Sequence, residues 1–320
     1  MKLLRIDHWL VYLSIFLLII PLLFPSLQFV NIVSEMLIMA LFAVSLNLLI
    51  GYTGLVSFGH CAFFAIGSYS VGIMLQRFGP SLPYAIPLTL LCGMVLSGIG
   101  ALIIGYFCTR LTEIYFAFLT LAFSQIIYSI IVKWEGFTGG DQGLVGGLPK
   151  PPLNFFGLVI DMKSPYSIYY LVVIATVLSF FLLKIVVESP FGWILRSIRG
   201  NSERIRFVGI NVRTYQIMIF VISGIFTGLA GGLMALHISG SYPDHAHWTK
   251  AAEPIFMIMI GGMEVFAGPI LGAILVTQVS AFIVAYAGVG LWGLIFGSLL
   301  IAFLMFGRRG ILDLLSLKVV

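Results

Sequence analysis

The sequence predicts an all-α, polytopic membrane protein. Of its 320 residues, 60% are hydrophobic and only 9% are charged, and the mean hydropathy is +1.12. A soluble domain carries about 25% charged residues, so this chain has too few charges to cover a surface that faces water. Most of its apolar stretches also lack the polar face that recurs every 3.6 residues in a soluble helix. The bulk of the surface is therefore expected to face lipid.

About ten apolar segments (between eight and ten crossings) are expected to form transmembrane helices, some of them broken or re-entrant, within one domain over 1–320. A hydrocarbon core about 30 Å thick needs roughly 20 helical residues. The eighth segment is too short to cross as a straight helix, so whether it crosses or re-enters stays open. The expected segments are 9–29, 32–50, 60–76, 84–106, 112–132, 166–187, 214–238, 253–262, 268–287 and 290–306.

Basic residues predict the orientation of these segments. The loop 188–213 contains five arginines and two glutamates, and both ends of the chain also carry basic residues. Because positively charged loops stay in the cytoplasm, this loop and both termini are expected inside, and the loops 133–165 and 238–252 outside. The net charge of +5 comes without a basic stripe and interleaved aromatic residues, so nucleic acid is not an expected partner.

Two glycine-rich interruptions separate apolar segments: GYTGLVSFGH at 51–60 and GGMEVFAGP at 261–269. Backbone that is not helical survives at membrane depth only when it is buried in protein or lines a wet cavity. The first interruption is therefore either a broken helix along a permeation path or an ordinary turn in which His60 is a satisfied interface residue. Both interruptions follow a segment that runs inward, so segments one to four and seven to ten could form a degenerate parallel repeat.

The cytoplasmic stretch 196–211 has the pattern of a short capped helix. Asn201 or Ser202 can cap it, Glu203 suits its first turn, and Gly209 can end it. A helix of this kind can serve as the docking site of a soluble partner. Alternatively, its arginines only enforce the orientation and touch anionic lipid.

The remaining polar residues give little support for catalysis. Glu264 is the one carboxylate near membrane depth that we would test for function. His245 and His247 could share a metal, but a solvated loop is the favoured interpretation, and no metal site is predicted. FTGGDQGL at 137–144 lacks the signature of a phosphate-binding loop and predicts a tight turn. No catalytic constellation is present, so neither catalytic residues nor an enzymatic activity are expected.

Several motifs together resemble the inner-membrane permeases of branched-chain amino acid ABC importers, most closely the M-type subunit. The resemblance implies a multi-pass protein of the bacterial inner membrane that works with a homologous second permease, two cytoplasmic ATP-binding subunits, a periplasmic substrate-binding protein and membrane lipid. ATP and Mg would be bound by the partners, and this chain would hold no cofactor. The motifs are LNLLIGYTGLVSFGHCAFFAIGSY (46–69), EIYFAFLTLAF (113–123), TGGDQGL (138–144), RSIRGNSERIRFVGINVRTYQIMIFVISGIFTGLAGGL (196–233) and GGMEVFAGP.

The resemblance also implies site residues, because the spacing from Glu203 to Gly209 is similar to that of the coupling motif that docks on the ATPases. The chain departs from the family where Arg204 and Ile205 replace the usual alanines, and where Glu264 stands in place of a small residue. The expected coupling residues are Arg196, Arg199, Asn201, Glu203, Gly209 and Ile210. The expected residues of the translocation path, which rest partly on the physical argument, are Asn47, Thr53, Ser57, His60, Thr120 and Glu264.

Two other functions stay open at this point. The same architecture could import urea, short amides or another small solute. An ion-coupled secondary carrier is a different class and is less favoured; Glu264 would then be its functional carboxylate.

Overall fold

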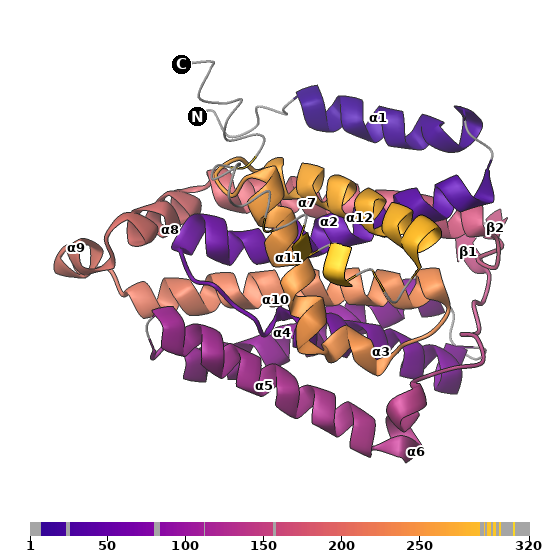
Figure 1. Ribbon diagram of the computed structural model, residues 1–320, viewed down its shortest axis with the longest axis horizontal. Helices are drawn as coiled ribbons and strands as arrows, with labels where there is room; N and C mark the ends of the chain where they lie inside the picture. The colour runs from indigo at the N-terminus through magenta and orange to yellow at the C-terminus, as the bar shows by residue number, and fades with distance from the viewer. Residues whose placement is uncertain are drawn as a thin grey trace.

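Long helices dominate the computed structural model, which describes residues 8–23, 26–79, 84–111, 113–155 and 158–288 and a few isolated positions beyond them. Most of the long helices run along the long axis of the molecule (Figure 1). The predicted helical membrane fold is confirmed in its class, but the expected count of about ten crossings is not. In the described part, seven helices are long and apolar enough to cross a membrane: α2 (Leu27–Thr53), α3 (His60–Phe78), α4 (Ala85–Cys108), α5 (Glu113–Lys133), α7 (Pro165–Glu188), α10 (Val212–Ile238) and α12 (Gly268–Ala287).

Two further helices coincide with expected segments but are shorter than a membrane span. They are α1 (His8–Leu23), with 16 residues, and α11 (Trp248–Gly261), with 14. In Figure 1, α11 crosses the bundle obliquely in front of α2 and α10. The expected tenth segment, 290–306, lies largely outside the described residues.

The connections contain structure of their own, and they define two ends of the molecule (Figure 1). The α8–α9 end carries α8 (Pro190–Gly200) and the short α9 (Ser202–Phe207). The opposite, hairpin end carries two short antiparallel strands. The elements of that end are α6 (Glu135–Thr138), η2 (Gly140–Gln142), β1 (Leu153–Phe155), β2 (Leu158–Ile160) and η3 (Pro243–Ala246).

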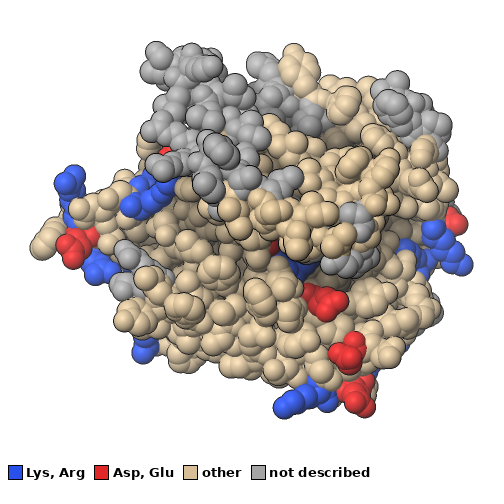
Figure 2. Space-filling model, viewed as in Figure 1, with Lys and Arg blue, Asp and Glu red and all other residues tan. Residues whose placement is uncertain are grey.

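Charged side chains follow this division. On the face shown in Figure 2, Lys, Arg, Asp and Glu gather mainly toward the ends and the lower edge of the molecule. Most of the surface between them is uncharged, apart from a small group near the centre. An uncharged band between charged ends is the surface that a protein presents to a bilayer.

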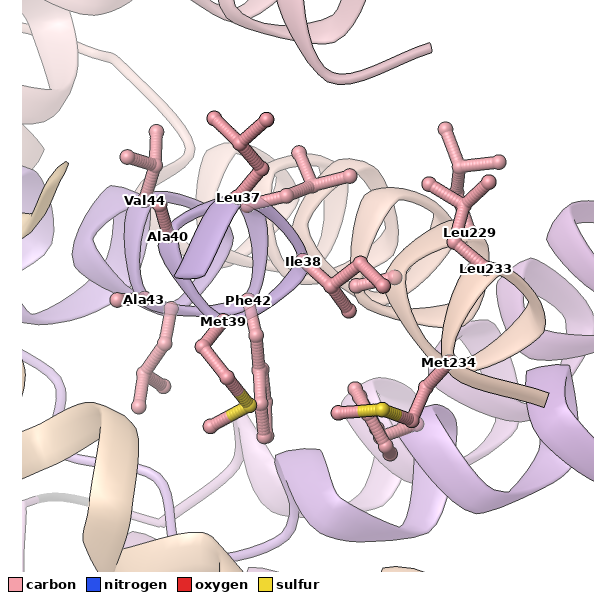
Figure 3. Close-up of a cluster of buried hydrophobic side chains, with 14 of the residues drawn as sticks. Leu37, Ile38, Met39, Ala40, Phe42, Ala43, Val44, Leu229, Leu233 and Met234 are labelled. Atoms are coloured by element: carbon pink, nitrogen blue, oxygen red, sulfur yellow. The ribbon is translucent and has the colours of Figure 1, made fainter. Parts of the chain in front are cut away.

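Helix α2 forms the centre of the bundle. Every residue from Met36 to Thr53 is buried, because this stretch is apolar on all sides and contacts α7, α8, α10, α11 and α12. Its aliphatic side chains meet Leu229, Leu233 and Met234 of α10 (Figure 3), and Phe42 stacks on a phenylalanine of α3 with ring centroids 4.8 Å apart.

Small residues allow α10 to touch α3 and α4 almost backbone to backbone. A Cβ atom added at Gly228 would lie 2.4 Å from the Ser97 Cβ of α4, and one at Gly231 would lie 1.8 Å from the Phe64 carbonyl oxygen of α3. The Ser97 hydroxyl in turn donates to the Phe63 carbonyl oxygen at 3.0 Å. Because lipid tails are as apolar as the helices, close packing and such hydrogen bonds hold membrane helices together. Small residues recur four apart in both α4 and α10, and this spacing is the sequence signal for the contact.

Replacing Gly231 by alanine is expected to separate α10 from α3, since a methyl group cannot occupy the space of a backbone carbonyl. Overpacking of this kind costs about 1–3 kcal/mol or more. The expected result is a lower midpoint of thermal unfolding in detergent. Gly136→Ala is the matched control, because nothing lies within 4 Å of a Cβ atom at that position; equal midpoints for the two variants would contradict the packing argument.

Candidate functional site

The first interruption leaves the last carbonyl groups of α2, that of Gly51 among them, without their helical partners. Gly54 ends the helix in the left-handed conformation (φ 77°), and the backbone N–H groups of Gly54 and Leu55 both donate to the Leu49 carbonyl oxygen. In a regular helix the Leu55 N–H would bond to the Gly51 carbonyl instead. The guanidinium of Arg199, from α8, replaces it: Nη1 donates to the Gly51 oxygen at 2.6 Å. A cation at a helix C-terminus is also favoured by the helix dipole.

The second interruption, between α11 and α12, lies against the first although 216 residues separate Asn47 from Met263. Asn47 Nδ2 donates to the Met263 carbonyl oxygen at 3.3 Å, and Arg199 Nη2 lies 3.5 Å from Met263 Sδ. Glu264 Oε1 is 3.9 Å from Arg199 Nη2, but these side chains are 69% and 33% exposed, so the ion pair contributes little. One arginine of α8 therefore contacts both interruptions.

This junction of the two interruptions, formed by Asn47, Gly51, Arg199, Met263 and Glu264, is tightly packed. A Cβ atom at Gly51 would lie 2.4 Å from the Met263 carbonyl oxygen, so only glycine fits there. Asn47 Oδ1 is buried and accepts no hydrogen bond from any described residue. A buried acceptor without a donor costs free energy. The junction is thus held by a few hydrogen bonds, donated by Arg199 and by Asn47 Nδ2, and not by a network in which every buried polar group has a hydrogen-bond partner.

His60 lies on the other side of the first interruption and is completely buried. Its Nε2 is 2.8 Å from Ser223 Oγ, which donates its own hydrogen to the Ser45 carbonyl oxygen at 2.5 Å. Ser223 must therefore accept from His60 Nε2–H, and in the neutral form of the ring Nδ1 accepts from Ser57 Oγ at 2.9 Å. Two phenylalanine rings pack edge-on against the imidazole. In this conformation His60 ties α3 to α2 and α10.

Thr120 and Thr53 also serve the backbone around the interruption. Thr120 Oγ1, from α5, accepts from the Phe58 N–H at 3.2 Å, and Thr53 Oγ1 donates to the Leu49 carbonyl oxygen at 2.8 Å. The structure thus places five of the expected path residues in the closed interior and Glu264 on the surface beside Arg199. Whether they line a path when the interruption opens stays a prediction.

The expected coupling residues occupy two helices, not one. Asn201 caps α9, since its Oδ1 accepts from the Arg204 N–H at 2.8 Å, and Gly209 has the positive φ of 88° that lets the chain turn after the helix. The side chain of Phe207 is 90% exposed. The sequence pattern did not predict α8 or the exposure of Phe207. Of the remaining members, Glu203 lies on α9, Ile210 follows it, and Arg196 on α8 stands over the Tyr52 ring at 5.2 Å.

At the hairpin end, the two long loops are joined. The Leu144 N–H donates to the Ser241 carbonyl oxygen at 2.8 Å, and Ser68 Oγ of α3 lies 3.0 Å from both Ser241 Oγ and His245 Nδ1. Contrary to the expectation of a solvated loop, His245 is buried, and that burial, together with the charge of Lys250, lowers its pKa to about 3. The loop is folded back because its serine and histidine find partners on α3.

The comparisons with known proteins agree with the resemblance. The family model described as branched-chain amino acid transport system / permease component matches residues 28–304. The chain is 28% identical over 265 residues to the high-affinity branched-chain amino acid transport system permease protein LivM of Escherichia coli (strain K12). That match covers 77% of this chain and 61% of the relative, so the chain spans about three fifths of the relative's length.

Permeases named for other substrates also match. The ribose import permease protein RbsC of Haemophilus influenzae is 23% identical over 69% of this chain and 63% of its own. A probable branched-chain amino acid transport permease protein LivM of Methanocaldococcus jannaschii is 23% identical over 72% and 74%. No solved structure matches significantly. The family is therefore shown more firmly than the substrate.

The neutral state of His245 predicts that the contact between the two long loops at the hairpin end, made by Leu144 and Ser241, opens in acid. With a pKa of about 3 when closed and its ordinary 6.5 when open, only the open state gains a proton as the pH falls below 6.5. Closure is thus fully stabilised above pH 6.5 and weakens toward pH 3. From pH 7.5 to 5.0, opening should become about thirtyfold more favourable, measured by hydrogen exchange at Leu144 and corrected for intrinsic rates. His245→Asn should lack this dependence; an unchanged slope in that variant would assign it to another group.

Proposed function

Because the chain belongs to the branched-chain amino acid transport system permease family, we propose that it is the membrane-spanning subunit of an ATP-driven importer and forms half of its translocation path. The observation that carries this proposal is the pair of contacts made by Arg199. This residue stands one turn before the exposed α9 and holds the Gly51 carbonyl of one helix interruption while it touches Met263 of the other. A displacement of α8 is thereby transmitted to both interruptions.

The proposed cycle uses these contacts as a linkage. Two cytoplasmic ATP-binding subunits would bind α9. The exposed Phe207 would supply an apolar contact for them, and the Asn201 cap would keep the start of this helix ordered. Movement of α8 would withdraw Arg199 from Gly51, and the interruptions would part. A conformational change of this kind requires that the partners bind the two states with different affinity. ATP and Mg belong to those partners in this proposal, and this chain contributes no catalytic group.

A branched-chain amino acid is the proposed substrate. When the interruptions part, the hydroxyl groups and the His60 ring now buried beside the first interruption would line the path, while the charged Glu264 lies at the surface. Such a lining suits a zwitterion with an apolar side chain, because it offers hydrogen bonds without net charge. A small sugar is the second candidate, since a ribose permease is among the relatives.

The proposed setting is a bacterial inner membrane, with the α8–α9 end in the cytoplasm. Five arginines between 188 and 213 favour that side. A homologous second permease would complete the path, and a periplasmic binding protein would deliver substrate at the hairpin end. Both chain termini are expected in the cytoplasm with α8 and α9.

Arg199→Gln tests the linkage. Loss of a hydrogen bond from a charged donor costs about 1.5–3 kcal/mol, so ATP-driven uptake of labelled leucine by proteoliposomes containing the assembled importer should fall about tenfold or more, while ATP hydrolysis persists. Arg77→Gln, at the hairpin end, is the control with the same loss of charge. Wild-type uptake by Arg199→Gln would refute the linkage. If the unmodified importer transported ribose and not leucine, its substrate would be a sugar and not a branched-chain amino acid.

Phe207→Ser tests the docking of α9. Removing an aromatic anchor from an interface costs about 2 kcal/mol or more, so co-purification of the ATP-binding subunits with this chain should drop about thirtyfold at a matched salt concentration. Val145→Ser removes another exposed apolar side chain, 58% exposed and far from α9, and should leave the complex intact. Equal recovery of the ATP-binding subunits with both variants would show that α9 does not anchor them.

A further inference from the structure

Two arginines near the α8–α9 end share one tyrosine, and no carboxylate of the described residues pairs with either. Arg213, at the start of α10, donates from Nη2 to the Tyr106 carbonyl oxygen at 2.8 Å, and Arg110 Nη2 donates to the Tyr106 hydroxyl at 2.8 Å. Each guanidinium carbon lies 4.8 Å from the centre of the Tyr106 ring. Among the described residues, neither guanidinium has a carboxylate within 4.0 Å, and the buried Arg213 Nε donates to no described acceptor. Within the part of the chain that the structure describes, no acidic side chain compensates this local charge.

An apolar groove begins one helical turn from this arginine pair, at Ile217 of α10 and Leu102 of α4. It has a volume of about 580 Å³ and lies between α4, α7, α8 and α10. Ile217 and Val221 follow Arg213 at intervals of four residues and so continue the same face of α10, while Leu102 lies one turn before Tyr106 on α4. The residues that line the groove are Leu102, Ile185, Val186, Ser189, Phe191, Ile217, Met218, Val221 and Ile222.

The arginine pair and the groove together have the length and polarity of a phospholipid. From Arg213 to Ile222 the rise along α10 is roughly 14 Å, which is about the depth of one leaflet of a 30 Å hydrocarbon core. An occupant must be apolar along that depth and anionic at the arginine end. Arginine binds phosphate with two donors in a planar fork, and Ser189 offers a hydroxyl at the groove's lining. Glu188 does not neutralise the arginines, because it pairs with Lys184 at 3.6 Å.

We propose that the pair Arg110–Arg213 and the groove between α4, α7, α8 and α10 form a binding site for one anionic phospholipid of the leaflet at the α8–α9 end. Its phosphate would lie on the two guanidinium groups and one acyl chain in the groove. The site is separate from the junction at Arg199. It borders α8, so the bound lipid would support the position of the helix that carries Arg199.

Native mass spectrometry of the assembled importer, delipidated and then titrated with phosphatidylglycerol or with phosphatidylcholine of the same acyl chains, tests the proposal. Each arginine near an anionic headgroup contributes about fivefold in affinity. The double variant Arg110→Gln/Arg213→Gln should therefore bind phosphatidylglycerol about 25-fold more weakly, and its preference over phosphatidylcholine should vanish. Arg206→Gln, an exposed arginine of α9 outside the pair, should bind phosphatidylglycerol as the unmodified chain does.

Two further measurements separate the headgroup from the groove. Met218→Trp should fill the groove and weaken lipid binding while both arginines remain, and its circular dichroism and elution volume establish that it is folded. Inorganic phosphate at millimolar concentration should not displace the lipid, because phosphate lacks the acyl chain. The proposal is overturned by equal binding of the two lipids, by full retention in the double variant, or by displacement with phosphate.

Discussion

The structure depends on one constraint: inside a membrane, every backbone group that leaves a helix must find a partner within the protein. Two helix interruptions at the same end of the bundle create such groups. The Gly51 carbonyl is met by Arg199 of α8, and the Met263 carbonyl by Asn47 of α2. Because each partner comes from a distant segment, the breaks, the central helix and α8 form one unit. None of these segments can move far without exposing a backbone carbonyl of another.

Histidine is used in a similar way on both sides of α3. His60, at the start of α3, and His245, which contacts Ser68 of the same helix, are both buried, and each is hydrogen-bonded to a serine hydroxyl group from another segment. A neutral imidazole can donate at one nitrogen and accept at the other. It therefore joins two elements without placing a charge in an apolar environment, where a lysine or arginine in the same place would need a counter-ion.

The sequence predicts the parts of this fold that depend on local properties. Apolar length located the long helices, and the side chain of Asn201 capped α9 as expected, because both signals act within a few residues. The 190–200 helix was missed because one face of it is polar and arginine-rich, which resembled a loop. The contacts of Arg199 with Gly51 and of Leu144 with Ser241 could not be predicted, since residues about 100 or more apart meet only through the packing of several helices. For the same reason, the burial of His245 was not foreseen.

The glycine-lined contact of α10 with α3 and α4 also has a consequence for how the chain is made. His60 and Ser223, which bond to each other, are 163 residues apart. At a synthesis rate of about 5–20 residues per second, roughly 8–33 s pass between their emergence from the ribosome. During that interval the small-residue face of α4 and the imidazole of α3 have no partner from α10. These surfaces of the nascent chain therefore need to be kept from lipid and from other chains by the insertion machinery until α10 is inserted. The order of synthesis thus affects how the bundle assembles.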